Sequence, residues 1–298
     1  MKLIDPSYEI VPQQPGLEGM YKQIELCGRI SHKSEDKITD TSYKKFIDMM
    51  RRLQHYATFE HGTIYLSIEE NSDPIDKSWK NIVEFYNRNP YSKVKYYDWT
   101  YYITTNYRVI VENNRGADMQ YICEPTEHHE KRVTVIFTCD IGVSREYNRH
   151  RVDSILEEST RYCNYASDKH GGELNIMIPI WLEEKRKDID NLLNEGFNFM
   201  DYCKYMANDR EDEFSDFDYW LMANLCAEHC YTKLIELGWT AQKARTILPL
   251  DTKTTLAHTA FESDWRHFFD LRALGTTGEP HPSAKQLAEP LMKDFENI

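Results

Sequence analysis

Apolar side chains recur at the spacing of a helix turn between residues 41 and 55, at Phe46, Met49, Met50 and Leu53. Thr41 or Ser42 can cap such a helix with its hydroxyl group, so the pattern predicts a helix that ends near His55. A second, shorter helix is predicted to begin at Asp140 and to include Val143 and Tyr147.

The C-terminal part of the chain is richer in helical patterns. Apolar residues between 217 and 237 predict a long buried helix, and Gly238 stands where a helix C-cap favours glycine. Segments 265–271 and 284–295 are further helix candidates, and the charged run EEKRKDID predicts a polar helix.

Alternating or β-branched segments predict strands. Ile64, Leu66 and Ile68 alternate with polar residues, and 133–138 is a β-branched run that can pair with them. A third strand is predicted from the alternation before Pro179, at Leu174, Ile176 and Ile178.

Two stretches look like additions to a compact core. Residues 71–131 surround the Tyr-rich sequence KVKYYDWTYYITTNYRVIVE, whose β-branched and aromatic residues favour strand or extended structure. Residues 187–215 are predicted to be peripheral. The chain has no repeats and no Gly/Ser linker, so the sequence predicts one α+β domain over 1–298, with more helix than strand.

Composition narrows the possible ligands. The 298 residues carry a formal net charge of -13, which argues against an open nucleic-acid surface, because such a surface needs a basic face. An anionic ligand must therefore meet a local basic pocket. The start MKLIDPSYEI does not resemble a secretion signal, and the sequence has no apolar run of membrane-spanning length. We expect a cytoplasmic protein that is not associated with a membrane.

Seven scattered cysteines, without a CxxC pair, predict reduced thiols. In the segment CAEHC, Cys226, His229 and Cys230 resemble half of a metal site. No second half accompanies them, so we predict that the segment packs in a helix and binds no metal.

The segment RHRVDSILEESTRYCNY places four potential cations within thirteen positions of an acidic protein: Arg149, His150, Arg151 and Arg161. Guanidinium groups suit phosphate, and the hydroxyl groups of Ser154 and Ser159 can complete a phosphate site. Taken alone, the segment is equally compatible with a solvated face balanced by Glu157 and Glu158.

These residues resemble the signature of the flavin-dependent thymidylate synthases (the ThyX family), RHRxxSxNxxSxRY. Every fixed position matches except that Leu156 replaces Asn. HYATFEH near the N-terminus and ARTILPLDTKTTLAHTAFESDWRHFFDLRA near the C-terminus resemble the same family, in the same order. The resemblance does not cover the insertions, about 71–131 and 187–215.

The resemblance implies a single domain with helices packed on a small, mainly antiparallel sheet. It also implies an enzyme that methylates dUMP to dTMP, with 5,10-methylenetetrahydrofolate as the carbon donor and FAD, reduced by NADPH, as the hydride donor. The family precedent is a homotetramer whose active sites are shared between subunits, with small molecules rather than nucleic acid as ligands.

Site residues are also implied by the matching motifs. The residues expected to contact FAD are His55, Ala57, Arg149, His150, Arg151, Glu157 and His267. Those expected to contact dUMP are Glu146, Tyr147, Asn148, Arg149, Glu157, Glu158, Ser159, Thr160, Arg161, Arg245 and Arg272. Within this set, 157–161 would come from a neighbouring subunit.

Arg272 is the predicted catalytic residue, since a permanently protonated guanidinium can stabilise negative charge on the pyrimidine. None of the cysteines lies in a recognisable nucleophile motif, and Ser159 has no evident base beside it, so Ser159 is assigned to binding. Individually, Arg245 and Arg272 could instead pair with carboxylates, His55 could end its helix, and His267 could be a core residue.

Some positions depart from the family pattern. Phe261, Glu262 and Ser263 stand where the family has an Asn-x-Arg stretch that touches the flavin, Ala57 replaces a hydroxyl residue, and Glu146 replaces Gln. One alternative is therefore a nucleotide-binding protein that has lost catalysis. Another is an RNA-binding protein that stacks bases on Tyr96, Tyr97, Tyr101 and Tyr102, although packing of the insert onto the body of the chain or onto another subunit explains these tyrosines better.

Overall fold

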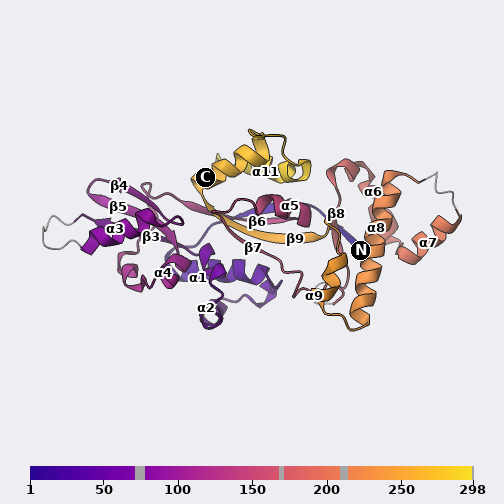
Figure 1. Cartoon of the computed structure of the whole chain (residues 1–298), viewed down its shortest axis with the longest axis horizontal. Coiled ribbons are helices and arrows are strands. Elements are labelled where there is room, and N and C mark those ends of the chain that lie inside the picture. Colours follow the sequence, from indigo (N-terminus) through magenta and orange to yellow (C-terminus); the bar gives the residue numbers. More distant parts are fainter. Residues whose placement is uncertain (71–77, 168–170, 209–213, 297–298) are drawn as a thin grey trace.

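The structure, a computed structural model, describes residues 1–70, 78–167, 171–208 and 214–296. It is elongated, with three parts along its long axis: an outer sheet with α3 and α4, a central sheet covered by helices, and a helical part with α6 to α9 (Figure 1). Each part has its own cluster of buried apolar residues. None of the described helices is both long and apolar enough to cross a membrane.

The central sheet is antiparallel and has the strand order β2-β6-β9-β7. Its strands are β2 (Ser7–Val11), β6 (Arg132–Asp140), β9 (Lys253–Phe261) and β7 (Ser154–Glu157). The longest pairing joins β6 and β9 over nine residue pairs, from Arg132 opposite Phe261 to Asp140 opposite Lys253. This sheet confirms the predicted fold class, in which helices pack on a small antiparallel sheet.

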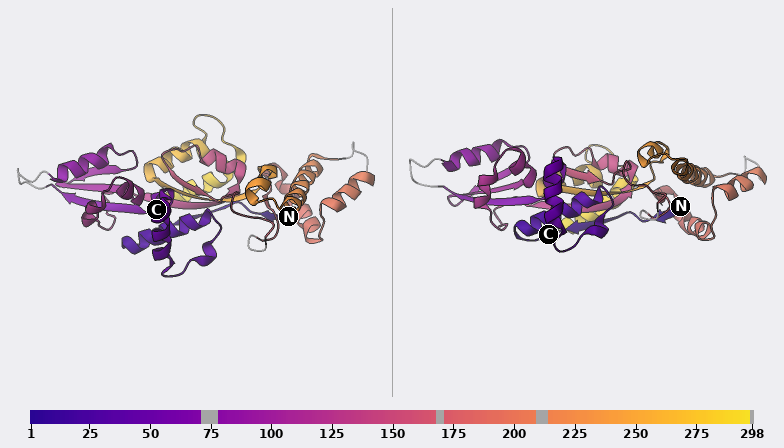
Figure 2. Two further views of the ribbon diagram at one scale, coloured as in Figure 1. Left: turned by 60° about the horizontal axis from the view of Figure 1, so that its bottom comes forward. Right: turned by 90° about the horizontal axis from the view of Figure 1, so that it is seen from below.

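Helices cover both faces of the central sheet, as Figure 2 shows. One face packs against α5 (Ile141–Tyr147), α10 (Glu262–Phe269) and α11 (Pro282–Phe295). Trp265 is fully buried there and donates from its indole nitrogen to the Val133 carbonyl oxygen at 3.1 Å. The other face packs against α1 (Gly16–Ile30), where Cys27 and Ile30 meet Ala257.

The insert forms a separate sheet and corrects one prediction. Strand β3 (Thr63–Glu69) pairs with β5 (Thr100–Asn106), which pairs with β4 (Lys93–Tyr97). The predicted strands at 64–68 and 133–138 therefore do not pair with each other, because the Tyr-rich segment folds back as a hairpin and supplies the partner of β3. Helix α3 (Ser78–Arg88) packs on this sheet.

The end of the Tyr-rich segment is also helical rather than extended. Tyr107–Glu112 forms α4, and the Asn106 side chain accepts from the Val109 amide at 3.1 Å. This cap favours a helix despite the β-branched residues that follow. The short 3-10 helix η3 (Gly116–Tyr121) comes next, and residues 71–77 lie outside the described part of the chain.

The tyrosines of the insert pack mainly on their neighbours. Tyr97 stacks on His128, with ring centroids 4.1 Å apart, and Tyr101 stacks on Trp79 at 5.4 Å. The Tyr96 hydroxyl donates to the Glu70 carboxylate at 2.9 Å. These contacts lie within the insert and at its edge, and not on the central part of the chain as expected, while packing against another subunit stays a prediction.

The helical part confirms several predictions. It contains β1 (Lys2–Ile4), parallel to β8 (Asn175–Met177), and the helices η5 (Ile180–Lys185), α6 (Arg186–Asn194), α7 (Phe199–Asn208), α8 (Asp216–Glu236) and α9 (Ala241–Ala244). Ser215 and Asp218 form a capping box at the start of α8. Gly238 follows the helix with a φ of 90°, a conformation that favours glycine. Residues 209–213 of the second predicted insertion lie outside the described residues.

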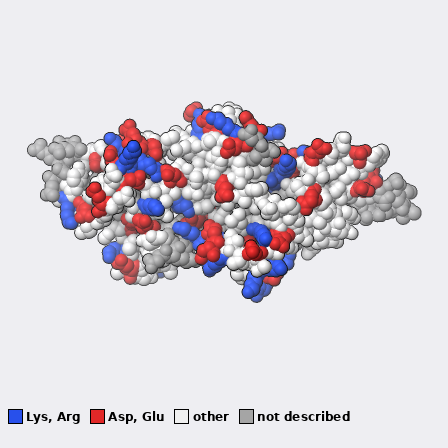
Figure 3. All heavy atoms as spheres, turned by 180° about the vertical axis from the view of Figure 1, so that it is seen from behind, with Lys and Arg blue, Asp and Glu red and all other residues white. Residues whose placement is uncertain are grey.

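The other predicted helices are also present. α2 (Ser42–Leu53) confirms the helix at 41–55, and Asp140 accepts from the Val143 amide at 2.6 Å as the predicted cap of α5. Helices α10 and α11 confirm the two candidates at 265–271 and 284–295. Charged groups of both signs are interspersed on the face in Figure 3, without one continuous basic surface over the described residues.

A buried histidine makes folding sensitive to acid. His61, in the 3-10 helix η2 (Tyr56–His61), is fully buried, and its Nδ1 lies 2.8 Å from Thr259 Oγ1. Burial, together with the nearby Arg132, lowers the His61 pKa from 6.5 to about 3. Between these values the unfolded chain binds a proton that the folded chain does not, so stability falls as the pH drops.

The free energy of unfolding should fall as the pH drops from about 6 to about 4.5. We predict that His61→Asn makes this fall smaller by about 1.4 kcal/mol per pH unit. Urea unfolding at several pH values measures this slope. His281→Asn, at an exposed histidine, is the control and should leave it unchanged. An unchanged slope in the His61 variant would contradict the prediction.

Candidate functional site

The predicted catalytic arginine is held by three contacts. Arg272 lies in the π-helical turn η8 (Asp270–Leu274), directly after α10. Its Nη1 donates to Glu146 Oε2 and its Nη2 to the Glu146 carbonyl oxygen, both at 2.6 Å, and its Nε donates to His150 Nε2 at 3.2 Å. The Arg272 side chain is only 11% exposed, so the guanidinium is fixed in one orientation.

Backbone geometry ends this turn. Gly275 has a φ of 68°, and a Cβ atom there would lie 2.8 Å from Pro280 Cδ and 2.9 Å from the Gly278 carbonyl oxygen. A π-helical turn is rare and often occurs at functional sites. The π-helical turn and the glycine that ends it together set the position of Arg272 next to α5.

His150 completes this group as a neutral acceptor. It is 7% exposed and packs against Phe268, with ring centroids 5.0 Å apart, and near His267 at 5.9 Å. Burial is the main cause that lowers the His150 pKa from 6.5 to about 4, and His258 and Arg272 add to the effect. At neutral pH the ring is therefore uncharged and can accept the hydrogen bond from Arg272.

Hydrogen bonds hold the Glu157 side chain close to α5. Its carboxylate accepts from Ser144 Oγ at 2.7 Å, Thr254 Oγ1 at 3.1 Å and Asn148 Nδ2 at 3.3 Å. Strand β7 thus brings Glu157 beside the end of α5, where Asn148 follows Glu146. The structure brings these three predicted site residues close together.

Glu158 is held in a different environment. Its side chain is 1% exposed and accepts from Lys253 Nζ at 2.8 Å, while its backbone amide donates to the Thr255 carbonyl oxygen. The Tyr147 side chain is also buried, donates to the Ala284 carbonyl oxygen at 2.8 Å, and packs against Phe137. For both residues, contact with a ligand would involve chiefly the backbone.

A second group lies around α9. Arg245 Nη1 donates to Thr160 Oγ1 at 3.3 Å, and Arg161 Nη2 donates to Gln242 Oε1 at 3.2 Å. Both arginines are exposed, and neither forms an ion pair with a described residue. Ser159 donates its amide to the Ser31 carbonyl oxygen at 2.9 Å. No hydrogen bond or ion pair among the described residues joins this group to Arg272.

The remaining predicted residues are exposed. Arg149, Arg151 and His267 lie at the surface, as do His55 and Ala57 at the start of η2. In the described part of the chain, the guanidinium groups of Arg149 and Arg151 have no carboxylate within ion-pair distance. They are therefore available to an anionic ligand.

The positions that depart from the family pattern have structural partners. Leu156 packs in an apolar cluster with Cys27, Ile30 and Ala257. Phe261 is buried, and Lys93 Nζ, from the insert, lies 5.2 Å from the centre of its ring and 3.1 Å from Ser263 Oγ. The insert thus places a cation at the segment where the family arginine is absent.

Sequence reasoning missed the buried pair that supports this site. Asp153 Oδ2 lies 2.7 Å from His258 Nε2, and both side chains are at most 1% exposed. Asp153 stands at an open position of the family signature, and His258 interrupts the apolar face of β9. A polar residue among the buried positions of a strand was the only signal that could have identified the pair.

Cys226 and Cys230 lie on α8 with their Sγ atoms 4.0 Å apart. His229 instead packs against Phe199, with ring centroids 5.0 Å apart. Within residues 1–70, 78–167, 171–208 and 214–296, no group of three potential ligands is arranged to hold a metal ion.

Fold and site together define an α+β protein in which Arg272 is held beside α5 and four further arginines of the predicted site are exposed. Residues 122–298 match the family described as thymidylate synthase complementing protein, and the chain belongs to this family. The predicted family and the enzyme class that it implies are thereby confirmed. HYATFEH, at 55–61, lies outside the matched residues.

Two solved structures are similar to the chain at low sequence identity. Both are crystal structures of the UMP/dUMP methylase PolB from Streptomyces cacaoi. The complex with 5-Br dUMP is 16% identical with a TM-score of 0.42, over 100% of this chain and 93% of that chain. The complex with 5-Br UMP is 15% identical with a TM-score of 0.43, over 100% and 92%. No curated protein matches the chain.

The Glu158–Lys253 pair yields a stability prediction. Lys253→Met leaves the buried Glu158 carboxylate without its cation, and we expect the free energy of unfolding to fall by about 3 kcal/mol. Urea unfolding at pH 7 measures the change. Lys243→Met, at an exposed lysine on α9, is the control. A loss below about 1 kcal/mol would mean that the pair behaves like a surface ion pair.

Proposed function

We propose that this chain is a flavin-dependent thymidylate synthase. It converts dUMP to dTMP with 5,10-methylenetetrahydrofolate as the carbon donor and releases tetrahydrofolate, and NADPH is the reductant. The observation that carries the proposal is the fixed guanidinium of Arg272, held between Glu146 and His150 within a chain of this family.

Arg272 is suited to stabilise an anionic pyrimidine. Its guanidinium group is oriented before the substrate arrives, so little reorganisation is needed during the reaction. Glu146 has two effects: it orients Arg272 through the contacts at 2.6 Å, and its carboxylate offsets part of the positive charge. Neutral His150 accepts the hydrogen bond from Arg272 Nε and adds no charge.

The residues near His150 fit FAD. Its two phosphate groups require cations, and Arg149 and Arg151 are exposed without a carboxylate partner among the described residues. When bound, FAD would supply the hydride. His55, Ala57 and His267 are the proposed neighbours of the flavin, and Lys93 would replace the cation that Ser263 does not provide.

The exposed arginines of the group around α9 fit the phosphate of dUMP. Arg161 and Arg245 contact only neutral acceptors in the described chain, and Ser159 and Thr160 add hydroxyl groups. This group has no contact with Arg272 in one chain, so we assign it to the active site of a neighbouring subunit. A homotetramer with shared sites is the proposed assembly.

The reaction can be tested through release of tritium from dUMP labelled at C5, with methylenetetrahydrofolate and NADPH. We expect Arg272→Ala to lower the rate about 100-fold or more, the scale seen when a preorganised donor to a developing anion is removed. Arg266→Ala, at an exposed arginine on α10, is the matched control and should retain full activity.

Two results would contradict the proposal. A protein that contains no flavin and stays inactive with added FAD would exclude the reaction. Bound dUMP without turnover would instead identify a nucleotide-binding protein that has lost catalysis.

Lys93 allows a separate test of the cofactor site. We predict that Lys93→Met lowers the affinity for FAD about tenfold, because a charge-assisted contact is lost. Fluorescence titration of the apoprotein with FAD measures the affinity. Lys80→Met is the control, since Lys80 is an exposed lysine of the insert, on α3, and makes no hydrogen bond or ring contact with Phe261 or Ser263. Equal affinities in the two variants would remove Lys93 from the site.

A further inference from the structure

A cavity lies where the insert meets the central part of the chain. It has a volume of about 220 Å³ and is enclosed by the segment before α1, strands β3 and β6, and residues 122–125 of the insert. Its apolar wall consists of Ile10, Val11, Met20, Ile122, Pro125 and Val133. A dry apolar cavity of about 150 Å³ already accommodates benzene, so this one is large enough for a ring with one substituent.

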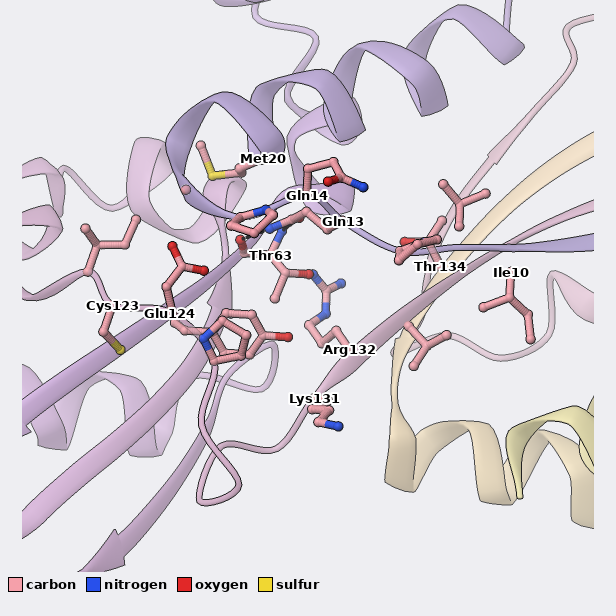
Figure 4. A pocket seen from close by; sticks show the side chains of 18 residues that line it. Ile10, Gln13, Gln14, Met20, Thr63, Cys123, Glu124, Lys131, Arg132 and Thr134 are labelled. Carbon is pink, nitrogen blue, oxygen red and sulfur yellow. Dashed lines mark hydrogen bonds between the residues drawn. The ribbon is translucent and has the colours of Figure 1, made fainter. Parts of the chain in front are cut away.

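Arg132 supplies the inner charge of this cavity. In Figure 4 its guanidinium lies beside Thr63, whereas Lys131 points away. Nη1 donates to the Glu60 carbonyl oxygen and Nη2 to Ser154 Oγ, both at 2.9 Å, and Nη1 also lies 3.4 Å from Thr63 Oγ1. All of these acceptors are uncharged.

Arg132 has no carboxylate within ion-pair distance in the described part of the chain, and its Nε is buried there without a hydrogen-bond partner. Burial lowers its pKa to about 10, and Tyr65, Glu60, Asp153 and Asp264 oppose this only at longer range. A buried cation without a counter-ion is costly, and a carboxylate is the group that best matches a guanidinium.

The other polar groups do not offset this charge. Glu124 and Lys131 are exposed residues of opposite sign at the edge of the cavity. Gln13 is bound to the backbone of Thr63, because its amide group donates to the Thr63 carbonyl oxygen at 2.9 Å and accepts from the Thr63 amide at 2.8 Å. Arg132 is therefore the group that selects the ligand.

We propose that this cavity binds a small monocarboxylate with an apolar body the size of one ring. The carboxylate would compensate Arg132, and the ring would lie against the apolar wall. None of the residues proposed for FAD or dUMP lines the cavity, so the inference does not depend on the proposed reaction. The insert provides part of the wall, so the cavity depends on residues of the insert.

Cys123 gives a direct readout because it lines the cavity and is a free thiol. The rate of its alkylation by iodoacetamide can be followed by peptide mass spectrometry in the full-length protein, with benzoate as the probe and benzamide as its neutral match. Benzoate at about four times its Kd should slow the reaction about fivefold, since only the free fraction reacts. Cys203, an exposed thiol outside the cavity, should react at an unchanged rate.

Benzamide should protect Cys123 at least about tenfold less effectively at equal concentration. Equal protection by both probes would indicate an apolar cavity without an anion site, and no protection by either would mean that the cavity does not bind such ligands. Both results overturn the proposal.

Arg132→Gln should abolish protection by benzoate, and protection that persists in a folded variant would also overturn the proposal. If this variant does not fold, Val11→Trp fills the cavity from the end of β2 and keeps Arg132. It should likewise abolish protection, and benzoate that still protects Cys123 there would place the binding elsewhere.

Discussion

The antiparallel pairing of β6 with β9 is the constraint on which the site depends. These strands lie more than a hundred residues apart in the sequence, yet nine consecutive pairs bring them into register. Helix α5 continues from β6, and α10 with its π-helical turn continues from β9. Because the strands are antiparallel, α5 starts at the Asp140–Lys253 end of the pairing and α10 at the opposite end, and Glu146 and Arg272 meet because both helices pack back over the same face of the sheet. A shift of the register by one residue would turn the inward side chains of β9 toward the opposite face and separate these two residues.

Buried charge is concentrated around the same sheet. Arg132, the Lys253–Glu158 pair and the Asp153–His258 pair all lie on or next to its strands. Such groups are costly to bury, and hydrogen bonds compensate only part of the cost. His61 and His150 remain neutral at pH 7 because burial lowers the pKa of each. These polar groups are not confined to one face of the sheet, since His258 and His150 pack against Trp265 and Phe268 on the face that α10 covers.

The insert does more than lengthen the chain. Its own sheet packs beside the central sheet and supplies Lys93 at Ser263 and part of the wall around Arg132. Departures from the family pattern at 261–263 coincide with this contact. The insert and the altered segment are therefore in direct contact, through the Lys93 ammonium group, the Phe261 ring and the Ser263 hydroxyl group.

The sequence by itself determined most of the local structure and the family. Caps and periodic patterns located α2, α5, α8, α10 and α11, because these signals depend on neighbours within one or two helix turns. The spacing from Arg149 to Tyr162 identified the family. Tertiary structure alone decided that β3 pairs with β5, that Asp153 meets His258, and that Glu146 holds Arg272. These contacts join residues far apart in the chain or depend on competing partners, and no local pattern encodes which partner a strand or a charge will meet.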